Sequence, residues 1–366
     1  MKLNWYLVFS YALGASFLLS LALTGVMRSV ARRWNIMDHP GERKMHSRPM
    51  PLLGGVAIWL AFYVMIFGHL LLAAAFGQLS PEWIEANVVA FLRENLVMKL
   101  VGIFVGGFII FVLGVIDDLV SLKPETKLVG QIVAALALVI PGIRLDLFTD
   151  NVWLTGAVTV LWVVMMTNSM NFLDNMDGLC GGVSVIAAFS FFMCVQPHEK
   201  AFVCVMLMIF AGSVGGFLYH NLSPARIFMG DAGAMFCGYI LATVAVLGTF
   251  YDKSTPSRVA VAAPLLALSV PIFDTLSVVY IRWRNGESIM KGDKRHFSHR
   301  LVALGMTPRQ AVEFIFLVAA VTGLGAALLP HVALIGTLII LAQTAGVFLL
   351  IVLIMAAKNG AAGSVK

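Results

Sequence analysis

The sequence predicts an all-α integral membrane protein, and this prediction rests on its composition and its long apolar runs. Of its 366 residues 60% are hydrophobic and only 12% are charged, and the mean hydropathy is +0.92. Soluble domains carry about 25% charged residues, so composition excludes a water-soluble fold for the chain as a whole. Because backbone polar groups in lipid must bond within their own segment, we expect the apolar runs to be helices.

The apolar runs divide the chain into about eleven predicted spans, each near the roughly 20 residues that a membrane crossing needs. The predicted spans are 4–27, 53–76, 97–116, 128–141, 153–168, 179–196, 201–219, 233–250, 259–281, 311–329 and 332–356. The fourth and fifth are short, so a count of ten stays open. The first is expected to remain as an uncleaved helix. No polar stretch between the spans is long enough for a soluble domain, so we expect residues 1–366 to form one polytopic membrane domain.

Lysine and arginine are distributed unevenly over the predicted loops. Those on one side, together with the C-terminal tail, hold 18 of the 25 basic residues. These loops are 28–52, 117–127, 169–178, 220–232 and 282–310. Because cytoplasmic loops carry the basic excess, we predict that the N-terminus lies outside and the C-terminus in the cytoplasm. The basic loops are also expected to contact anionic membrane lipids.

Carboxylate and amide side chains stand at the ends of these spans, all on the predicted cytoplasmic side. They are Asp117, Asp118, Asn171, Asp174, Asp177 and Asp231. Ionisable groups at membrane depth are costly and usually mark a substrate path or a catalytic site. Clustered carboxylates need a counter-charge, and oxygen ligands suit Mg²⁺, which completes its shell with water and substrate phosphate. The pattern predicts a metal-dependent membrane enzyme, with a polar or capped helix end as the simpler alternative for each motif.

Two further loops carry groups suited to phosphate. His296-Phe297-Ser298-His299-Arg300 lies in the most basic predicted loop, and histidine with arginine can clamp a phosphate during its transfer. A zinc site is less favoured because no cysteine or third histidine is near in sequence. Residues 38–55 combine prolines and glycines with Lys44 and His46 and lead into a predicted helix N-terminus, which suits an anion.

Taken together and in this order, several blocks resemble the polyprenyl-phosphate N-acetylhexosamine-1-phosphate transferases, of the glycosyltransferase 4 type. The blocks are the one ending in Asp117-Asp118, then NFLDNMDG, NLSPARIFMGDAG, PIFDTLSVV and DKRHFSHRL. The resemblance runs from Asp38 to about Gln310. The family includes the transferase that makes the first lipid-linked peptidoglycan precursor and enzymes that start O-antigen, common-antigen and teichoic-acid linkage synthesis.

The histidine loop is similar to that of the second group, whose usual pattern is His-x-His-His. Here Ser298 replaces the middle histidine, so catalytic roles are expected for His296 and His299. The peptidoglycan branch carries three histidines followed by Phe-Glu. The resemblance therefore favours a GlcNAc-1-phosphate transferase over the phospho-MurNAc-pentapeptide transferase, which stays as the alternative.

The resemblance implies a reaction at the cytoplasmic face of a bacterial inner membrane. Undecaprenyl phosphate attacks the β-phosphate of a UDP-N-acetylhexosamine, UMP leaves, and synthesis of a cell-envelope polysaccharide begins. Mg²⁺ is the implied cofactor, with Mn²⁺ as a substitute, and a homodimer is implied by analogy with relatives. No nucleic acid partner is expected.

The resemblance also implies roles for residues. Asn171 and Asp231 would hold Mg²⁺ on the donor pyrophosphate, and Asp117 would orient or deprotonate the lipid phosphate. Asp118 would support Asp117, and Asp177 would contact uracil. Phosphate or nucleotide contacts are expected for Gly230, Lys127, Arg300, Lys44, His46 and Asp174, with the role of Asp174 open. Asp274 is expected to be a structural or supporting carboxylate.

Two questions stay open at this point. Asp117 acts either as a base in a single displacement or as a nucleophile in a two-step route. We favour direct attack, because a lipid phosphate is already ionised near neutral pH. A secondary transporter is the competing class, but its usual internal repeats and midplane sites are not seen in the sequence.

Overall fold

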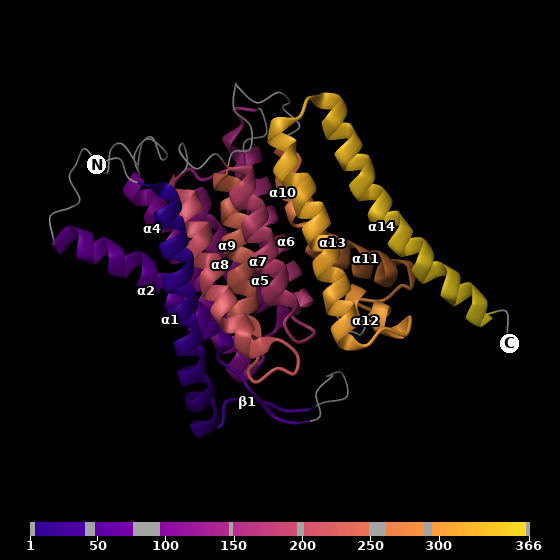
Figure 1. Cartoon of the computed structure of the whole chain (residues 1–366), viewed down its shortest axis with the longest axis horizontal. Helices are drawn as coiled ribbons and strands as arrows, with labels where there is room; N and C mark the ends of the chain where they lie inside the picture. The colour runs from indigo at the N-terminus through magenta and orange to yellow at the C-terminus, as the bar shows by residue number, and fades with distance from the viewer. Residues whose placement is uncertain are drawn as a thin grey trace.

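The computed structural model describes residues 4–40, 48–75, 96–145, 149–195, 201–248, 261–288 and 295–363. Most of its helices run side by side as a bundle, from which the C-terminal helix diverges (Figure 1). The helices are α1 (Trp5–Arg33), α2 (Gly54–Ala75), α4 (Leu96–Val120), α5 (Pro124–Val139), α6 (Val152–Leu173), α7 (Leu179–Cys194), α8 (Ala201–Asn221), α9 (Gly230–Leu247), α10 (Ala263–Ala267), α11 (Ser269–Arg284), α12 (Phe297–Ala303), α13 (Pro308–Leu328), the 3₁₀ turn η3 (Leu329–His331) and α14 (Leu334–Gly363). Within these ranges the strands are β1 (Met37–Asp38) and β2 (Met50–Pro51), which pair antiparallel with Met37 opposite Pro51.

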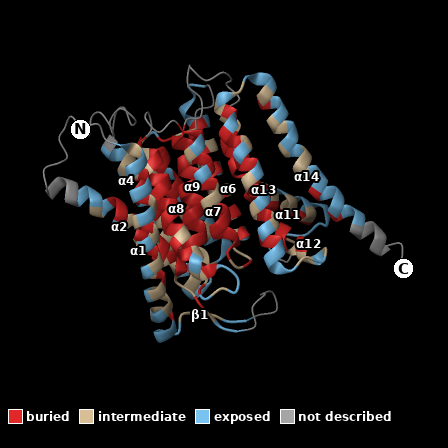
Figure 2. Ribbon diagram, viewed as in Figure 1, coloured by how far each residue is buried: buried red, intermediate tan, exposed pale blue. Residues whose placement is uncertain are grey.

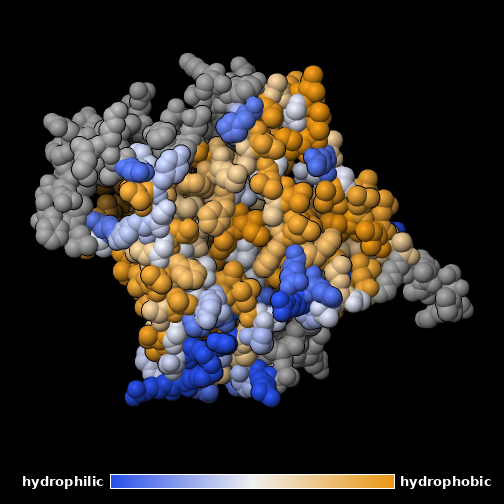
Figure 3. Space-filling view, in the orientation of Figure 1, coloured by the Kyte–Doolittle hydropathy of each residue, from blue (hydrophilic) through white to orange (hydrophobic). Residues whose placement is uncertain are grey.

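The structure confirms an all-helical membrane protein. Eight of the described helices are long and apolar enough to cross a membrane: α1, α2, α4, α6, α8, α9, α13 with η3, and α14. Shorter helices such as α7 complete the bundle. On the face of the molecule shown in Figure 3, apolar residues predominate across the middle, and hydrophilic residues gather at the lower end. Each predicted span coincides with a described helix or pair of helices, while the number of crossings and the orientation stay predictions.

The predicted span 259–281 differs from expectation because it is not one continuous helix. Within its described part α10 ends at Ala267, and α11 starts at Ser269 after Leu268 leaves the helical region, with φ −108° and ψ 19°. In an unbroken helix Pro271 would have no N–H to donate to the Ala267 carbonyl, and its ring would clash with that carbonyl. The chain therefore breaks one turn before the proline.

Helix α9 lies at the centre of the bundle, where buried residues concentrate (Figure 2). Its residues 232–247 are all buried, the pattern of a helix surrounded by others on every side. Helices α2, α4, α6 and α7 pack against it. The first turn of α9 is consequently where the ends of several helices meet.

Glycines let neighbouring helices approach this first turn closely. A Cβ on Gly114 of α4 would lie 2.3 Å from the Cα of Ala232, and one on Gly55 of α2 would lie 2.1 Å from the Gly233 nitrogen. Neither position has room for a side chain. Backbone-to-backbone packing thus fixes the end of α4 and the start of α2 against α9.

The start of α2 is also tied to α9 by hydrogen bonds. The Gly54 N–H donates to the Phe228 carbonyl (3.0 Å), and the Gly55 N–H donates to the Met229 carbonyl (2.8 Å). Free N–H groups at a helix start attract anions, but these two are already bonded. The expected anion site at this helix N-terminus is therefore not supported for Gly54 and Gly55.

Candidate active site

A cavity of about 1050 Å³ lies where these helix ends converge. Its lining includes most of the predicted site residues: Asp117, Asp118, Lys127, Asn171, Asp174, Asp177, Gly230, Asp231, His296 and His299. Residues far apart in the chain are thus brought together at one end of the bundle. Lys44 and His46 lie outside the described residues.

Arg300 is described, but it does not line the cavity. Its guanidinium donates to the Ser277 hydroxyl (2.5 Å) and lies over the Phe273 ring, 5.8 Å from the centroid. These contacts hold α12 against α11. The predicted phosphate contact of Arg300 is therefore without structural support, and a structural role accounts for its position.

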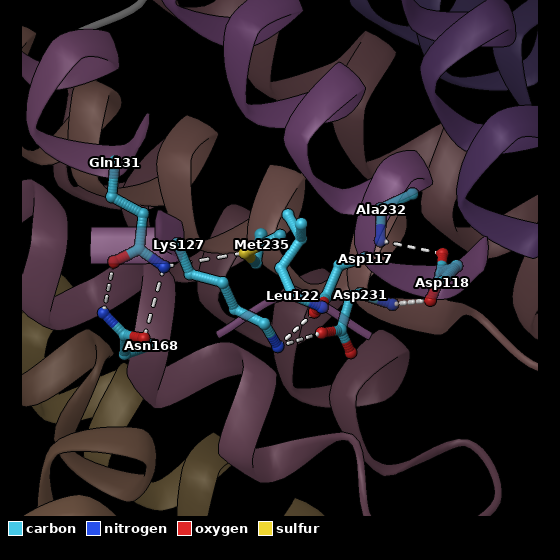
Figure 4. A network of polar contacts seen from close by, with 9 residues as sticks. All are labelled: Asp117, Asp118, Leu122, Lys127, Gln131, Asn168, Asp231, Ala232 and Met235. Carbon is cyan, nitrogen blue, oxygen red and sulfur yellow. Dashed lines mark hydrogen bonds and ion pairs between the residues drawn. The ribbon is translucent and has the colours of Figure 1, made fainter. Parts of the chain in front are cut away.

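Lys127 joins two carboxylates from different helices (Figure 4). Its ammonium lies 2.8 Å from an Asp231 oxygen and is also paired with Asp117. The second Asp117 oxygen accepts the Leu122 N–H at 2.7 Å. The three charged side chains come from α4, α5 and α9, so one lysine stabilises the meeting point of three helices.

Asp118 has a different environment from Asp117. One Asp118 oxygen accepts the Asp231 N–H at 2.7 Å, and the other accepts the Ala232 N–H at 3.2 Å. Both N–H groups belong to the first turn of α9, where the helix itself offers them no acceptor, and a carboxylate is favourable at this position. Asp118 therefore caps α9 from a neighbouring helix and fixes the backbone of Asp231.

Gly230 is required at the start of α9 for two reasons. Its φ is +71°, a backbone conformation that residues with a side chain rarely adopt. A Cβ at this position would also lie 2.5 Å from an Asp118 oxygen. The residue thus makes room for the Asp118 cap. Gly230 also lines the cavity, while its place beside a nucleotide stays a prediction.

Asn171, Asp174 and Asp177 follow one tight connection between α6 and α7. Asn171 lies in the last turn of α6 and is a hydrogen-bond partner of Asp231, while Asp174 ends the helix. Burial, together with the negative charges of Asp231 and Asp118, raises the pKa of Asp174 to about 8. In metal-free protein this shift favours the protonated form of Asp174.

Asp177 and Asn221 tie this connection to the loop before α9. An Asp177 oxygen accepts the Ala225 N–H (3.0 Å). The Asn221 side chain accepts the Gly178 N–H (3.0 Å) and donates to the Ile227 carbonyl (2.9 Å). Asn221 was visible in the sequence at the start of a motif, but its bridging role required the structure.

His296 is held in place by Asp274 of α11. Its Nδ1 lies 2.8 Å from one Asp274 oxygen, and the other oxygen accepts the Phe297 N–H at 2.5 Å. Because a carboxylate is the acceptor, Nδ1 carries the hydrogen and Nε2 is the ring nitrogen left for the cavity. Asp274 thus acts as a supporting carboxylate by holding the His296 ring in place. Ser298, which replaces the usual histidine, donates to the Asn175 side chain at 2.6 Å.

Sequence reasoning missed part of the cavity wall. Asp38 of β1 lines it, as do Arg309 and Glu313 of α13. Arg309 and Glu313 form an ion pair across one helical turn, at 2.8 Å. The sequence does mark the start of α13, the helix that carries Arg309 and Glu313. Thr307-Pro308 is a typical helix start, and Thr307 makes a capping box with Gln310.

The cavity carries more negative than positive charge. Its described lining holds seven carboxylate side chains but, besides histidines, only Lys127 and Arg309 as basic groups. In the described chain no three His, Cys, Asp or Glu side chains form a metal cluster. Asn171 and Asp231 both line the cavity, and their amide and carboxylate oxygens are of the type that a hard cation with few protein ligands takes.

Comparison with known proteins agrees with this geometry. Residues 100–249 match glycosyl transferase family 4. A "probable undecaprenyl-phosphate N-acetylglucosaminyl 1-phosphate transferase" of Bacillus subtilis is 31% identical over 86% of this chain and 83% of its own length. A decaprenyl-phosphate N-acetylglucosaminephosphotransferase of Mycolicibacterium smegmatis is 31% identical over 83% and 78%. A phospho-N-acetylmuramoyl-pentapeptide-transferase of Desulforudis audaxviator is 29% identical over 86% and 96%.

The helical bundle, its polar cavity and these matches define a multi-pass membrane transferase. The chain belongs to glycosyl transferase family 4, within the polyprenyl-phosphate N-acetylhexosamine-1-phosphate transferases of bacteria. The family predicted from the sequence blocks is therefore confirmed.

Proposed function

We propose that the protein transfers GlcNAc-1-phosphate from UDP-GlcNAc to undecaprenyl phosphate at the cytoplasmic membrane face, with release of UMP. GlcNAc as the sugar is supported by two relatives at 31% identity whose names specify N-acetylglucosamine. The related muramoyl-pentapeptide transferase, at 29%, keeps the larger donor as the alternative. The cytoplasmic orientation is supported by the basic loops of the sequence.

The observation that carries the proposal is the acidic cavity at one end of a membrane bundle. Its volume of about 1050 Å³ is at the upper end of the range for small-molecule sites, so a nucleotide sugar and a lipid head group both fit. One substrate is soluble and the other is lipid-bound, so the reaction needs a site at the membrane surface. The converging helix ends provide it.

A divalent cation is part of the proposal. Substrates bearing a diphosphate and a phosphate are repelled by the ionised carboxylates of the wall, and a cation removes this repulsion. Asn171 and Asp231 would hold it. When bound, Mg²⁺ would neutralise charge on the donor pyrophosphate and favour departure of UMP.

The chain's own charged residues would position the reacting groups. Lys127 reaches both Asp117 and Asp231, so its ammonium is placed to neutralise phosphate oxygens between them. Both Asp117 oxygens are already engaged, by Lys127 and by the Leu122 N–H. This favours direct attack by the lipid phosphate, with Asp117 orienting Lys127 rather than acting as a nucleophile.

His296 would contact the transferring phosphoryl group from the opposite wall. Its ring is fixed by Asp274 through Nδ1, and in the imidazolium form Nε2 donates to a phosphate oxygen. His299 lies beside it, with ring centroids 6.4 Å apart. A fixed imidazole can stabilise developing charge without reorganising during the reaction.

The experiment is UMP release by purified protein in detergent, with UDP-GlcNAc and undecaprenyl phosphate, with and without Mg²⁺. We expect release that needs both substrates and the metal. Asp231→Asn should abolish it while the thermal midpoint stays near that of the wild type. Near-normal turnover of Asp231→Asn would remove this residue from the proposed metal site, and a protein that moves substrate across vesicles without releasing UMP would be a transporter.

A further inference from the structure

An amide pair lies beneath the charged residues, with Gln131 buried and Asn168 half-buried, and neither of its members was singled out in the sequence. Gln131 of α5 donates to the Asn168 oxygen (3.2 Å), and Asn168 of α6 donates back to the Gln131 oxygen (2.7 Å). Gln131 is only 1% exposed. Figure 4 shows the two amides facing each other, with Gln131 also directed toward Met235 of α9.

The remaining donors of the pair are also used. The Gln131 amide lies 3.6 Å from the Met235 sulfur, and the Asn168 amide donates to the Val164 carbonyl at 2.8 Å. A buried polar network that is fully satisfied favours one arrangement of its helices over others. The pair therefore sets how α5, α6 and α9 lie relative to one another.

Each member of this network is one helical turn from a charged or polar residue of the cavity. Gln131 follows Lys127 by four residues on α5, and Met235 follows Asp231 by four on α9. Asn168 precedes Asn171 by three on α6. Side chains three or four positions apart lie on the same helical face. On each of the three helices, the network residue thus lies one helical turn away from the residue that lines the cavity.

From this stacking we infer that Gln131 and Asn168 are positioning residues for the transfer reaction, which align Lys127, Asn171 and Asp231 without touching substrate. The inference rests on the proposed function. A shift of one helix by about 1 Å is enough to lower a rate as much as 100-fold. The amide pair restrains such a shift, because sliding or rotation of α5 against α6 breaks both of its hydrogen bonds.

The test compares five variants. Gln131→Met and Asn168→Leu each remove one amide at similar size, and a double variant removes both. Gln131→Asn combined with Asn168→Gln exchanges the two side chains and rebuilds the pair. Thr159→Val is the matched control, because Thr159 is a buried residue of α6 that accepts the Leu145 N–H (2.9 Å) and does not line the cavity.

Three properties are measured for each variant: kcat and KM for UDP-GlcNAc, the thermal midpoint, and Mn²⁺ binding in the presence of UDP. Electron paramagnetic resonance detects the bound Mn²⁺. Both single variants should lose about tenfold or more in kcat and bind Mn²⁺ more weakly, with donor KM within about threefold. Replacing both partners by apolar groups removes unsatisfied donors. The double variant should therefore regain the thermal midpoint but not kcat, and the exchanged pair should regain both.

A purely structural pair predicts a different result. In that case kcat would follow the thermal midpoint, and the double variant would recover activity along with stability. Wild-type kcat in both single variants, or a loss in Thr159→Val equal to theirs, would also overturn the inference. If the wild type releases no UMP, the proposed function fails, and Mn²⁺ binding in the same variants decides the positioning role by itself.

Discussion

Replacing Gly230 by alanine should damage the site through a single added methyl group. Alanine at φ +71° costs about 1–2 kcal/mol in the left-handed region. The added Cβ would lie 2.5 Å from an Asp118 oxygen, whereas ordinary contacts begin at 3.4 Å. The carboxylate must therefore move by about 1 Å, which weakens its bonds to Asp231 and Ala232 at a further cost of about 0.5–2 kcal/mol.

We expect Gly230→Ala to destabilise the protein by about 1.5–4 kcal/mol and to lower kcat by about 10- to 100-fold, because the backbone of Asp231 moves with the cap. The assays are the thermal midpoint in detergent and UMP release. Gly286→Ala is the matched control: its φ is +67° and nothing lies within 4 Å of the added Cβ. It should show the conformational cost with normal kcat. Equal kcat and equal thermal midpoints for the two variants would refute the reasoning.

Three further predictions concern charged residues of the cavity. Lys127→Met removes the cation beside Asp231 and should lower UMP release by about 100-fold or more, with partial recovery in Lys127→Arg. Asp274→Asn keeps the size of the side chain but removes the charge that holds His296, and should lower kcat by up to about 100-fold with little change in donor KM. Burial raises the pKa of Asp174 from 3.8 to about 8, so the folded metal-free protein binds one more proton than the unfolded chain between these values. Its contribution to stability is full below pH 3.8 and is lost as the pH rises through about 8. The thermal midpoint of metal-free protein should fall over this range, and Asp174→Asn should flatten the fall.

Each of these predictions has an outcome that contradicts it. Full activity of Lys127→Met would show that its two ion pairs are only structural. A proportional change of kcat and thermal midpoint in Asp274→Asn would assign that residue to folding alone. An unchanged pH slope in Asp174→Asn would mean that this carboxyl is ionised in the folded metal-free protein.

Much of the fold was predictable because apolar length alone decides where helices form in a membrane. Every predicted span coincides with a described helix or pair of helices. The break at Leu268 was not predicted, although Pro271 was visible, because hydropathy does not respond to a missing N–H. Helix contacts, such as Gly114 against Ala232, depend on tertiary packing that no local pattern records.

Most of the predicted site residues line one cavity, but the contacts that each of them makes were not predictable from the sequence. Asp117 and Asp118 are equivalent in sequence, yet consecutive helical residues point about 100° apart. One consequently meets Lys127, and the other caps α9. Gln131 was overlooked because a lone amide in an apolar run has no visible partner, and Asn168 lies 37 residues away in sequence.

A donor panel tests the central claim most directly. Purified protein is given undecaprenyl phosphate, Mg²⁺ and, in turn, UDP-GlcNAc, UDP-GalNAc, UDP-diNAcBac and UDP-MurNAc-pentapeptide, and UMP release is measured for each. The proposed function predicts the highest kcat/KM with UDP-GlcNAc, loss of release when the lipid or Mg²⁺ is omitted, and a lipid-linked diphosphate sugar as product. Release with UDP-MurNAc-pentapeptide alone would assign the protein to the peptidoglycan branch, and no release with any donor would contradict the proposed activity.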